Sequence, residues 1–237
     1  MLKAIFVWVC IALSAAVIGT LVIFTYPFDR HQGLAHRLVK IWGKVALMAC
    51  RVKVRVEGLE QIPGKGPYIF MSNHQGTYDI FSLQVHLPFE FKWLAKKELF
   101  SIPILGWAMA VAGYIRIDRE GTRETVEAMK EAAQKIHDGM SVVIFPEGTR
   151  SPDGSIQPFK KGGFTLALKA KVPIVPIAIS GSRDVMPKDR LSAASGEIRI
   201  RLDRPIETES HSLRDRRLLM EKVRETIVKN FKLISQK

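Results

Sequence analysis

Two residues in a short polar segment have the types and the spacing that acid–base chemistry needs. His74 and Asp79 stand five residues apart in segment 73–79, with an apolar run on either side. Reactive groups in α/β proteins commonly follow strands, and a histidine in such a turn can fold back onto a carboxylate. The carboxylate then fixes the imidazole tautomer and leaves the second ring nitrogen as a base. The pair predicts a general base, although a histidine before a helix is also typical of a structural cap.

Such a base suits the attack of a hydroxyl group on a thioester. The hydroxyl must lose a proton, whereas the thioester is already activated and needs no covalent enzyme intermediate. A positioned base typically contributes about 10²- to 10⁴-fold in rate. Acyl transfer to an alcohol is therefore the hypothesis that this pair favours.

A second polar segment, residues 145–151, could bind an anion. It follows an apolar run and reads FPEGTRS, with a glycine that favours a sharp turn. A guanidinium can clamp a phosphate through two parallel hydrogen bonds, and a helix N-terminus adds positive potential. A plain turn followed by a solvated helix face remains the alternative. The candidate anion ligands are Arg150, Lys160 and Lys161.

Two further segments carry weaker signals. Residues 113–119 read as a strand that ends at Arg119, another candidate phosphate ligand. Residues 172–177 contain Pro173 and Pro176, and a proline inside a strand indicates an edge position or a bulge. The apolar segment 102–112 is a candidate wall for an acyl chain, or else a plain core helix.

Strand and helix patterns alternate after residue 50, as an α/β layer protein requires. Apolar runs and two-residue alternation predict strands, whereas apolar residues that recur every three to four positions predict helices. No repeat or low-complexity linker interrupts residues 51–237, which predicts one domain. The predicted strands are 52–57, 68–72, 91–95, 114–118, 141–145, 174–180 and 197–202, and the predicted helices are 80–87, 122–138, 159–170 and about 212 onward.

Residues 4–26 form an uncharged apolar run that is long enough to cross a membrane. A helix of this length reaches roughly 35 Å, against a hydrocarbon thickness of about 30 Å. A cleaved signal peptide usually has a shorter run and a small-residue cleavage site, so we expect a spanning or deeply embedded anchor. Basic residues from Arg30 to Lys53 place the rest of the chain on the cytoplasmic side by the positive-inside rule.

The next segment, residues 34–49, has the pattern of an amphipathic helix. Its apolar residues recur at helical spacing, and its basic residues fall mostly elsewhere on the wheel. It either packs on the domain as an ordinary helix or lies on anionic lipid with Trp42 at the headgroup level. Residues 1–50 are therefore expected to form a two-helix membrane anchor ahead of a catalytic domain at 51–237.

The formal net charge of +13 indicates an acidic partner, which could be nucleic acid, an anionic membrane surface or an acidic carrier. Nucleic acid ranks last, because no groove-reading motif or aromatic platform is present. A hydrolase is disfavoured by the lack of G-x-S-x-G and H-E-x-x-H motifs. Cys10 and Cys50 lie far apart in apolar surroundings, which indicates inert thiols in a reducing compartment.

Taken in order, segments 73–79, 113–119, 145–151 and 172–177 resemble the four sequence blocks of the glycerolipid acyltransferase family, which includes bacterial 1-acylglycerol-3-phosphate acyltransferases. The resemblance implies an α/β fold, a single domain with a central mixed sheet flanked by helices, with His74 as general base and Asp79 as its partner. The sequence departs from the family at Arg116, where an apolar residue is usual. The implied substrate-binding residues are Arg119, Glu147, Gly148, Thr149, Arg150, Lys160 and Pro173.

The reaction implied by this resemblance moves a fatty-acyl group from acyl carrier protein (acyl-ACP) or acyl-CoA to the sn-2 hydroxyl of 1-acyl-sn-glycerol 3-phosphate (lysophosphatidic acid), giving phosphatidic acid. It uses no metal and no cofactor besides the thioester. The implied location is the cytoplasmic face of an inner or plasma membrane. One alternative is a different acceptor, such as glycerol 3-phosphate, a lysophospholipid or a lyso-ornithine lipid. An alternative of another class is a non-catalytic, basic membrane-binding module.

Overall fold

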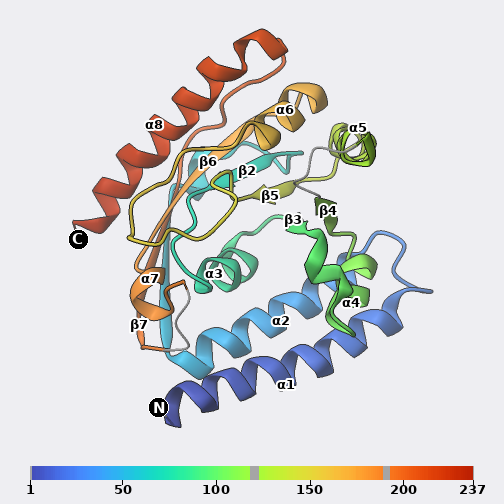
Figure 1. Ribbon diagram of the computed structural model, residues 1–237, viewed down its shortest axis with the longest axis vertical. Coiled ribbons are helices and arrows are strands. Elements are labelled where there is room, and N and C mark those ends of the chain that lie inside the picture. Colours follow the sequence, from blue (N-terminus) through green and yellow to red (C-terminus); the bar gives the residue numbers. More distant parts are fainter. Residues whose placement is uncertain (1, 118–122, 189–192, 237) are drawn as a thin grey trace.

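A seven-stranded sheet forms the centre of the computed structural model, which describes residues 2–117, 123–188 and 193–236. The strand order is β1-β7-β6-β2-β5-β3-β4 (Figure 1). Strands β6, β2, β5, β3 and β4 run parallel to one another, whereas β7 pairs antiparallel with β6 and parallel with β1. The mixed α/β sheet implied by the family resemblance is therefore present.

The strands and helices follow the alternation predicted from the sequence. The strands are β1 (Val52–Glu57), β2 (Ile69–Ser72), β3 (Lys92–Lys96), β4 (Ile115–Ile117), β5 (Val142–Ile144), β6 (Ile174–Ser180) and β7 (Gly196–Leu202). The helices are α1 (Leu2–Thr25), α2 (Gly33–Cys50), α3 (Tyr78–His86), α4 (Leu105–Val111), α5 (Arg123–His137), α6 (Lys161–Ala170), α7 (Ser182–Val185) and α8 (Arg216–Ser235), with short 3₁₀ turns at Leu59–Gln61, Lys97–Ser101 and Leu213–Asp215.

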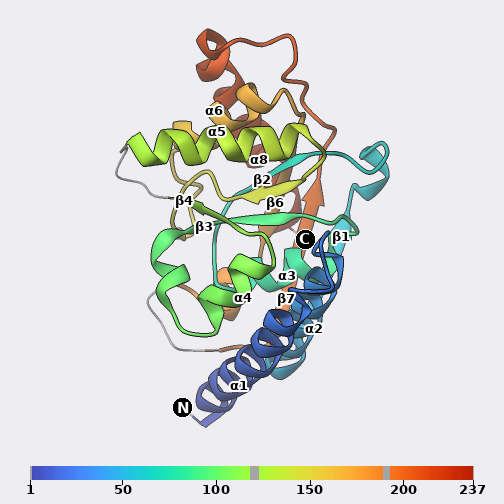
Figure 2. The same ribbon diagram turned by 90° about the vertical axis from the view of Figure 1, so that its right-hand side faces the viewer.

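Helices cover both faces of the sheet and enclose two hydrophobic cores. Helices α5, α6 and α8 pack on one face, and α3 and α2 pack on the other, with α1 outside them (Figures 1 and 2). Residues along β2 alternate between the two cores, since Phe70 belongs to the α3 side and Met71 to the α6 side. A strand covered on both faces needs a continuous apolar run, which is what the sequence of β2 supplies.

The chain changes sheet face between β2 and its neighbour β5. Strand β2 leads into α3 on one face, whereas β5 leads into α6 on the opposite face. In open α/β sheets such a reversal opens a crevice outside the carboxyl ends of the two strands, where ligands bind. Segments 73–79 and 145–151 follow β2 and β5 respectively, so the topology brings both to this edge of the sheet.

The N-terminal helices share the core of the domain. Val7 and Ile11 of α1 and Leu47 of α2 are buried in the same cluster as the side chains of β6 and β7. Among the described helices, only α1 is long and apolar enough to cross a membrane. The predicted boundary near residue 50 falls between α2 and β1, but the two helices are integral to the folded unit.

The sequence left Pro176 either in an edge strand or in a bulge, and the structure excludes the edge strand. Strand β6 lies between β7 and β2, so Pro176 is not in an edge strand. Its carbonyl accepts a hydrogen bond from the backbone N–H of Asp203 (3.0 Å), just beyond the end of β7. Proline has no backbone N–H to donate. At Pro176 this missing donor would face the point where the pairing with β7 ends, so the interior strand tolerates a proline there.

Trp42 is half-buried and packs against the core of the domain. Its indole N–H donates to the carbonyl of Ile11 in α1 (3.2 Å), and its ring packs edge-on against Phe81 of α3 with 5.0 Å between centroids. The tryptophan thus joins three helices, because a half-buried indole needs both apolar contact and a hydrogen-bond partner.

Candidate active site

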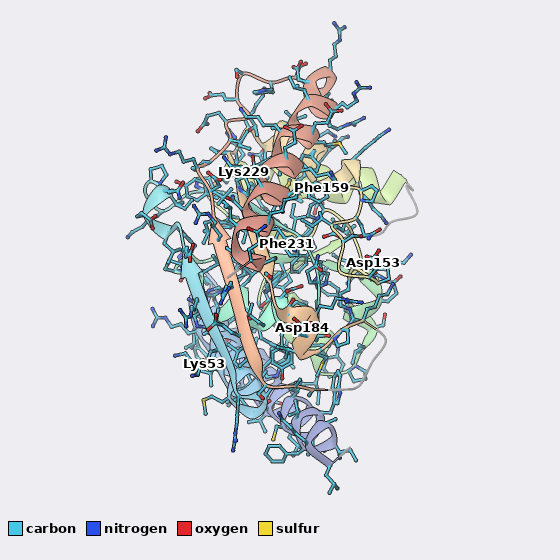
Figure 3. The ribbon with its side chains drawn as sticks, turned by 90° about the vertical axis from the view of Figure 1, so that its left-hand side faces the viewer. Lys53, Asp153, Phe159, Asp184, Lys229 and Phe231 are labelled. Carbon is cyan, nitrogen blue, oxygen red and sulfur yellow. The ribbon has the colours of Figure 1, made fainter. Side chains whose placement is uncertain are left out.

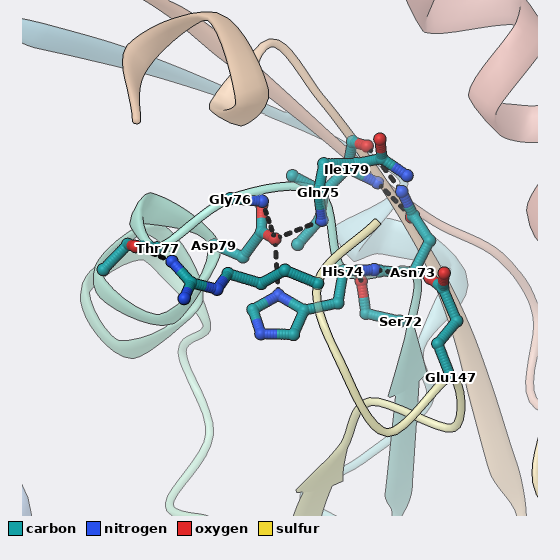
Figure 4. A network of polar contacts seen from close by, with 10 residues as sticks. Ser72, Asn73, His74, Gln75, Gly76, Thr77, Asp79, Glu147 and Ile179 are labelled. Atoms are coloured by element: carbon teal, nitrogen blue, oxygen red, sulfur yellow. Dashed lines mark hydrogen bonds and ion pairs between the residues drawn. The ribbon is translucent and has the colours of Figure 1, made fainter. Parts of the chain in front are cut away.

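His74 and Asp79 form the predicted pair (Figure 4). Nδ1 of His74 lies 2.8 Å from Oδ2 of Asp79, which also accepts the backbone N–H groups of Gln75 (2.7 Å) and Gly76 (2.9 Å). An oxygen that accepts two N–H groups is itself an acceptor toward the imidazole, so Nδ1 carries the proton. Nε2 is then the nitrogen with a free lone pair, as a general base requires.

The turn that carries His74 is fixed by its neighbours in sequence. The side chain of Asn73 exchanges two hydrogen bonds of 2.8 Å with the backbone N–H and carbonyl of Ile179, which extends the pairing of β2 with β6. A side chain at Gly76 would meet the carbonyl oxygen of Ser182 at 2.4 Å, so only glycine fits there. These contacts set the direction in which the imidazole leaves the sheet.

The loop after β5 holds the backbone of His74 from the other side. Glu147 accepts the N–H of His74 (2.7 Å) and the N–H of Gln157 (2.8 Å), and the N–H of Ser151 donates to the His74 carbonyl (2.8 Å). Glu147 is 2% exposed. Burial raises its pKa to about 7, opposed by these two backbone hydrogen bonds. Glu147 therefore fixes the turn that carries His74, and each of its two carboxylate oxygens accepts a backbone N–H group.

Arg150 lies at the same sheet edge as His74. Its Nη1 donates to the hydroxyl of Thr77 at 2.7 Å, and Thr77 precedes the helix that carries Asp79. This bond fixes one part of the guanidinium and leaves its other donors available to an anion. The predicted approach of Arg150 to the His–Asp pair is thus present.

A sharp turn at Gly148 brings the loop back toward α6. Gly148 has φ +76°, a conformation that favours glycine. The exposed side chain of Lys160 lies over it, because a Cβ at Gly148 would be 3.1 Å from Cδ and Cε of Lys160. Thr149 is exposed on the same turn. The loop therefore presents two cations, Arg150 and Lys160, at the carboxyl edge of the sheet.

Two predicted site residues are not brought to this edge. Pro173 precedes β6, and its carbonyl accepts the N–H of Ile69 at the start of β2 (3.0 Å). Because β2 and β6 are parallel, Pro173 lies at the opposite end of the sheet from His74. The structure therefore does not bring Pro173 beside His74. Arg119 lies outside the described residues.

Three residues at the site were not singled out from the sequence. Asn73 and Thr77 belong to the recognised 73–79 segment, and a buried Asn after a strand could have indicated the clamp on β6. The third is Phe145, whose ring stacks on the imidazole of His74 with 3.9 Å between centroids. An aromatic residue at the end of a strand has no signal that distinguishes it from ordinary core.

The apolar segment proposed as an acyl-chain wall forms part of the layer beside α1. A Cβ at Gly19 of α1 would lie 3.0 Å from Ile104 and 3.6 Å from Ala108 of α4. Trp107 of α4 is 64% exposed.

Among the side chains that the structure describes, no group of three His, Cys, Asp or Glu residues is placed to hold a metal ion.

Comparisons with known proteins place the chain in the acyltransferase family. The model of the acyltransferase family matches residues 53–180. A chloroplastic 1-acyl-sn-glycerol-3-phosphate acyltransferase of Brassica napus is 34% identical over 94% of this chain and 64% of its own length. A human 1-acyl-sn-glycerol-3-phosphate acyltransferase alpha is 37% identical over 78% of this chain and 65% of its own. The chain thus spans slightly less than two thirds of these curated relatives.

A solved structure extends the likeness over nearly the whole chain. The crystal structure of the 1-acyl-sn-glycerophosphate (LPA) acyltransferase PlsC from Thermotoga maritima has a TM-score of 0.83 to this structure at 27% sequence identity. The match covers 98% of this chain and 95% of that one, so it includes both N-terminal helices.

Proposed function

The chain belongs to the acyltransferase family, and we propose that it transfers a fatty-acyl group from a thioester donor to the sn-2 hydroxyl of 1-acyl-sn-glycerol 3-phosphate, giving phosphatidic acid. The observation that carries this proposal is the His74–Asp79 pair, with a 2.8 Å contact at Nδ1 and Arg150 bonded to Thr77 two residues before Asp79. Relatives named for this activity support the choice of acceptor.

The mechanism uses Nε2 of His74 as a proton carrier. Nε2 takes the proton of the sn-2 hydroxyl while the hydroxyl oxygen attacks the thioester carbonyl carbon. As the tetrahedral intermediate collapses, the C–S bond breaks, and the leaving thiolate receives the proton from Nε2. Asp79 holds the imidazole in the required tautomer and stabilises its charged form. No metal or organic cofactor is required, because the thioester is already activated.

The acceptor phosphate is assigned to the cations at the carboxyl edge. Arg150 offers a planar guanidinium held by Thr77, and Lys160 adds a second positive charge beside Gly148. We place Arg119 with them on the family resemblance. Both acyl-ACP and acyl-CoA are anionic, and the net charge of +13 suits either donor.

The membrane surface is assigned to α1 and α2. Helix α1 exposes large apolar side chains along its outer side, including Phe6, Leu13 and Leu21. The outward side of α2 alternates apolar and basic residues three or four positions apart, which suits a lipid interface with anionic headgroups. These residues are Leu34, Arg37, Ile41, Lys44 and Met48, all exposed.

The packing of the two helices favours an embedded arrangement over a single span. Helix α1 lies along α2, and α2 packs on α3 within the domain (Figure 1). If α1 crossed the bilayer, α2 would have to enter the hydrocarbon with Arg37 and Lys44 exposed, at a cost of several kcal/mol for each charge. We propose that the helix pair lies in the cytoplasmic leaflet of the inner or plasma membrane.

An acyl-transfer assay tests the catalytic part of the proposal. Labelled acyl-ACP and acyl-CoA are each supplied with lysophosphatidic acid, glycerol 3-phosphate, a lysophospholipid or lyso-ornithine lipid, and with no acceptor. We expect phosphatidic acid from wild type and a loss of at least about 100-fold in His74→Ala. The matched control, His211→Ala, changes a histidine at the amino end of the sheet and should leave the rate unchanged. Product from another acceptor only, thioester loss without acceptor, or equal rates for His74→Ala would each overturn the proposal.

Vesicle flotation tests the membrane part. The double substitution Arg37→Glu/Lys44→Glu should release the protein from phosphatidylglycerol-rich vesicles, because each basic residue near an anionic surface contributes about 1 kcal/mol. The control Lys222→Glu/Lys229→Glu makes the same charge change on exposed positions of α8. Equal binding of both variants would refute the assignment of this surface.

A further inference from the structure

A stack of two aromatic rings backs the imidazole of His74. The phenyl ring of Phe145 lies parallel to the imidazole, with 3.9 Å between centroids and 9° between planes. The indole of Trp93 stacks on Phe145 in turn, at 5.6 Å and 24°. Phe145 follows β5 and Trp93 lies in β3, so two neighbouring strands supply the stack. The catalytic ring is therefore held at its edge by Asp79 and at its face by Phe145.

The second ring of the stack is itself fixed in place. The indole N–H of Trp93 donates to the side-chain carbonyl of Gln84 at 2.7 Å, and Phe91 packs against the indole edge at 5.5 Å. Gln84 lies on α3, the helix that also carries Asp79. One helix thus positions both the carboxylate and, through Trp93, the ring that faces the imidazole.

The parallel geometry has an electrostatic consequence for proton transfer. The face of a phenyl ring carries negative potential, and a cation within about 6 Å of its centroid is attracted to it. A neutral imidazole gains little from this potential, whereas an imidazolium gains a charge interaction. The stack therefore favours the form of His74 that exists after it has taken a proton, which is the state that a general base reaches in the transition state.

We propose that Phe145, backed by Trp93, is a positioning residue that stabilises the imidazolium form of His74 during acyl transfer. This proposal rests on the proposed function, in which His74 is the general base. Phe145 is the first residue of the 145–151 segment, and its proposed role is separate from the anion binding proposed for that segment.

Charged side chains contact His74, its backbone or the turn beside it. Asp79 on α3 favours the imidazolium, and Arg150, which is bonded to Thr77 at the same edge, opposes it. Glu147 accepts the backbone N–H of His74, and burial raises the pKa of Glu147 to about 7. A test must therefore change the ring potential while leaving these three groups in place.

Fluorinated phenylalanine at position 145 provides that change. One, three and five fluorine atoms withdraw electron density stepwise from the ring face with little change in volume. We expect kcat/KM for lysophosphatidic acid to fall stepwise, by about tenfold over the series. The midpoint of the acid limb of the rate-versus-pH profile should move stepwise to lower pH. Trp93→Leu should shift this midpoint in the same direction by a smaller amount.

Fluorinated Phe231 serves as the matched control. Phe231 lies on α8 (Figure 3) and packs in the core on the opposite face of the sheet from Phe145, so its substitution should leave both rate and midpoint unchanged. A flat series at position 145 together with an inactive His74→Ala variant would overturn this inference and leave the proposed function intact. An active His74→Ala variant would instead overturn the proposed function itself. A rate loss at position 145 with no movement of the midpoint would indicate a packing role and also refute the inference.

Discussion

The two ends of the parallel strands differ in how they are held together. At the carboxyl end, charged and amide side chains bind backbone groups, as Asp79, Glu147 and Asn73 do around His74. At the amino end, neutral groups join the strand starts, as when the Pro173 carbonyl accepts from Ile69 and the Thr208 hydroxyl donates to Val172. The two ends therefore differ in the groups that join them, and under the proposed function only the carboxyl end holds reacting atoms.

This difference shows that sequence segments recognised together do not all lie together in the structure. Segments 73–79 and 145–151 meet in space because they follow adjacent parallel strands, β2 and β5. Segment 172–177 includes Pro173 before a strand, so the same topology places that proline at the far end. Four predictions test whether the contrast extends to function, beginning with the largest expected effect.

Asp79→Asn should produce the largest loss at the carboxyl end. The amide keeps the volume and can still accept from the backbone N–H groups of Gln75 and Gly76, but it no longer fixes the imidazole with a charge. We expect kcat to fall at least about 100-fold with KM little changed. Steady-state kinetics with lysophosphatidic acid measure both constants, and a near-wild-type kcat would remove the carboxylate from the mechanism.

Arg150→Lys should affect acceptor binding more than the chemical step. Lysine keeps the charge but loses the planar donors that bind phosphate and the Thr77 hydroxyl together. We expect KM for lysophosphatidic acid to rise about tenfold, with a smaller change in kcat. Thr77→Val, which removes only the partner of Arg150, should raise KM less. An unchanged KM in the lysine variant would place the phosphate elsewhere.

Glu147→Gln should alter how stability depends on pH. Burial raises the pKa of this carboxyl to about 7 in the folded state, from 4.5 as its ordinary value. The folded state therefore binds the proton more tightly, and its stability falls as pH rises from 4.5 through 7. The glutamine variant lacks this titration, so its melting temperature should vary less between pH 5 and pH 7.5 than that of wild type. If the melting temperature of the two proteins changed equally with pH, the raised pKa of a buried Glu147 would be contradicted.

Pro173→Ala should have the smallest effect. The substitution lies at the amino end of the sheet, so we expect activity within about twofold of wild type and a stability loss of about 1 kcal/mol or less. Thermal melting and the same kinetic assay measure the two quantities. A loss of kcat as large as that of Asp79→Asn would mean that the two ends of the sheet are coupled.

The sequence predicted the elements and the central pair well, for physical reasons. Strand β7 alternates along its length between more and less exposed side chains, and β2 is buried on both faces, so apolar periodicity identifies each strand. His74 and Asp79 are five residues apart, and a local turn is enough to bring them together. Features of this kind can be predicted from the sequence because the interacting residues are close together in the chain.

Contacts across the sheet could not be predicted in the same way. The position of Pro176 in an interior strand depends on where β7 ends, 26 residues later at Leu202. The stacking of Phe145 on His74 depends on the order of β2, β5 and β3. The inward direction of the Glu147 carboxylate depends on the packing of the loop after β5 against the turn after β2, where the backbone N–H of His74 donates to it.

The shared packing of the N-terminal helix bears on attempts to make a water-soluble enzyme. Val7, Ile11 and Val22 of α1 are buried against the rest of the chain. A truncation after Thr25 would delete these side chains and expose the apolar surfaces that they cover, and each such loss costs about 1.5–3 kcal/mol. An ordinary domain has a total stability of about 5–15 kcal/mol, so we expect the truncated chain to be strongly destabilised.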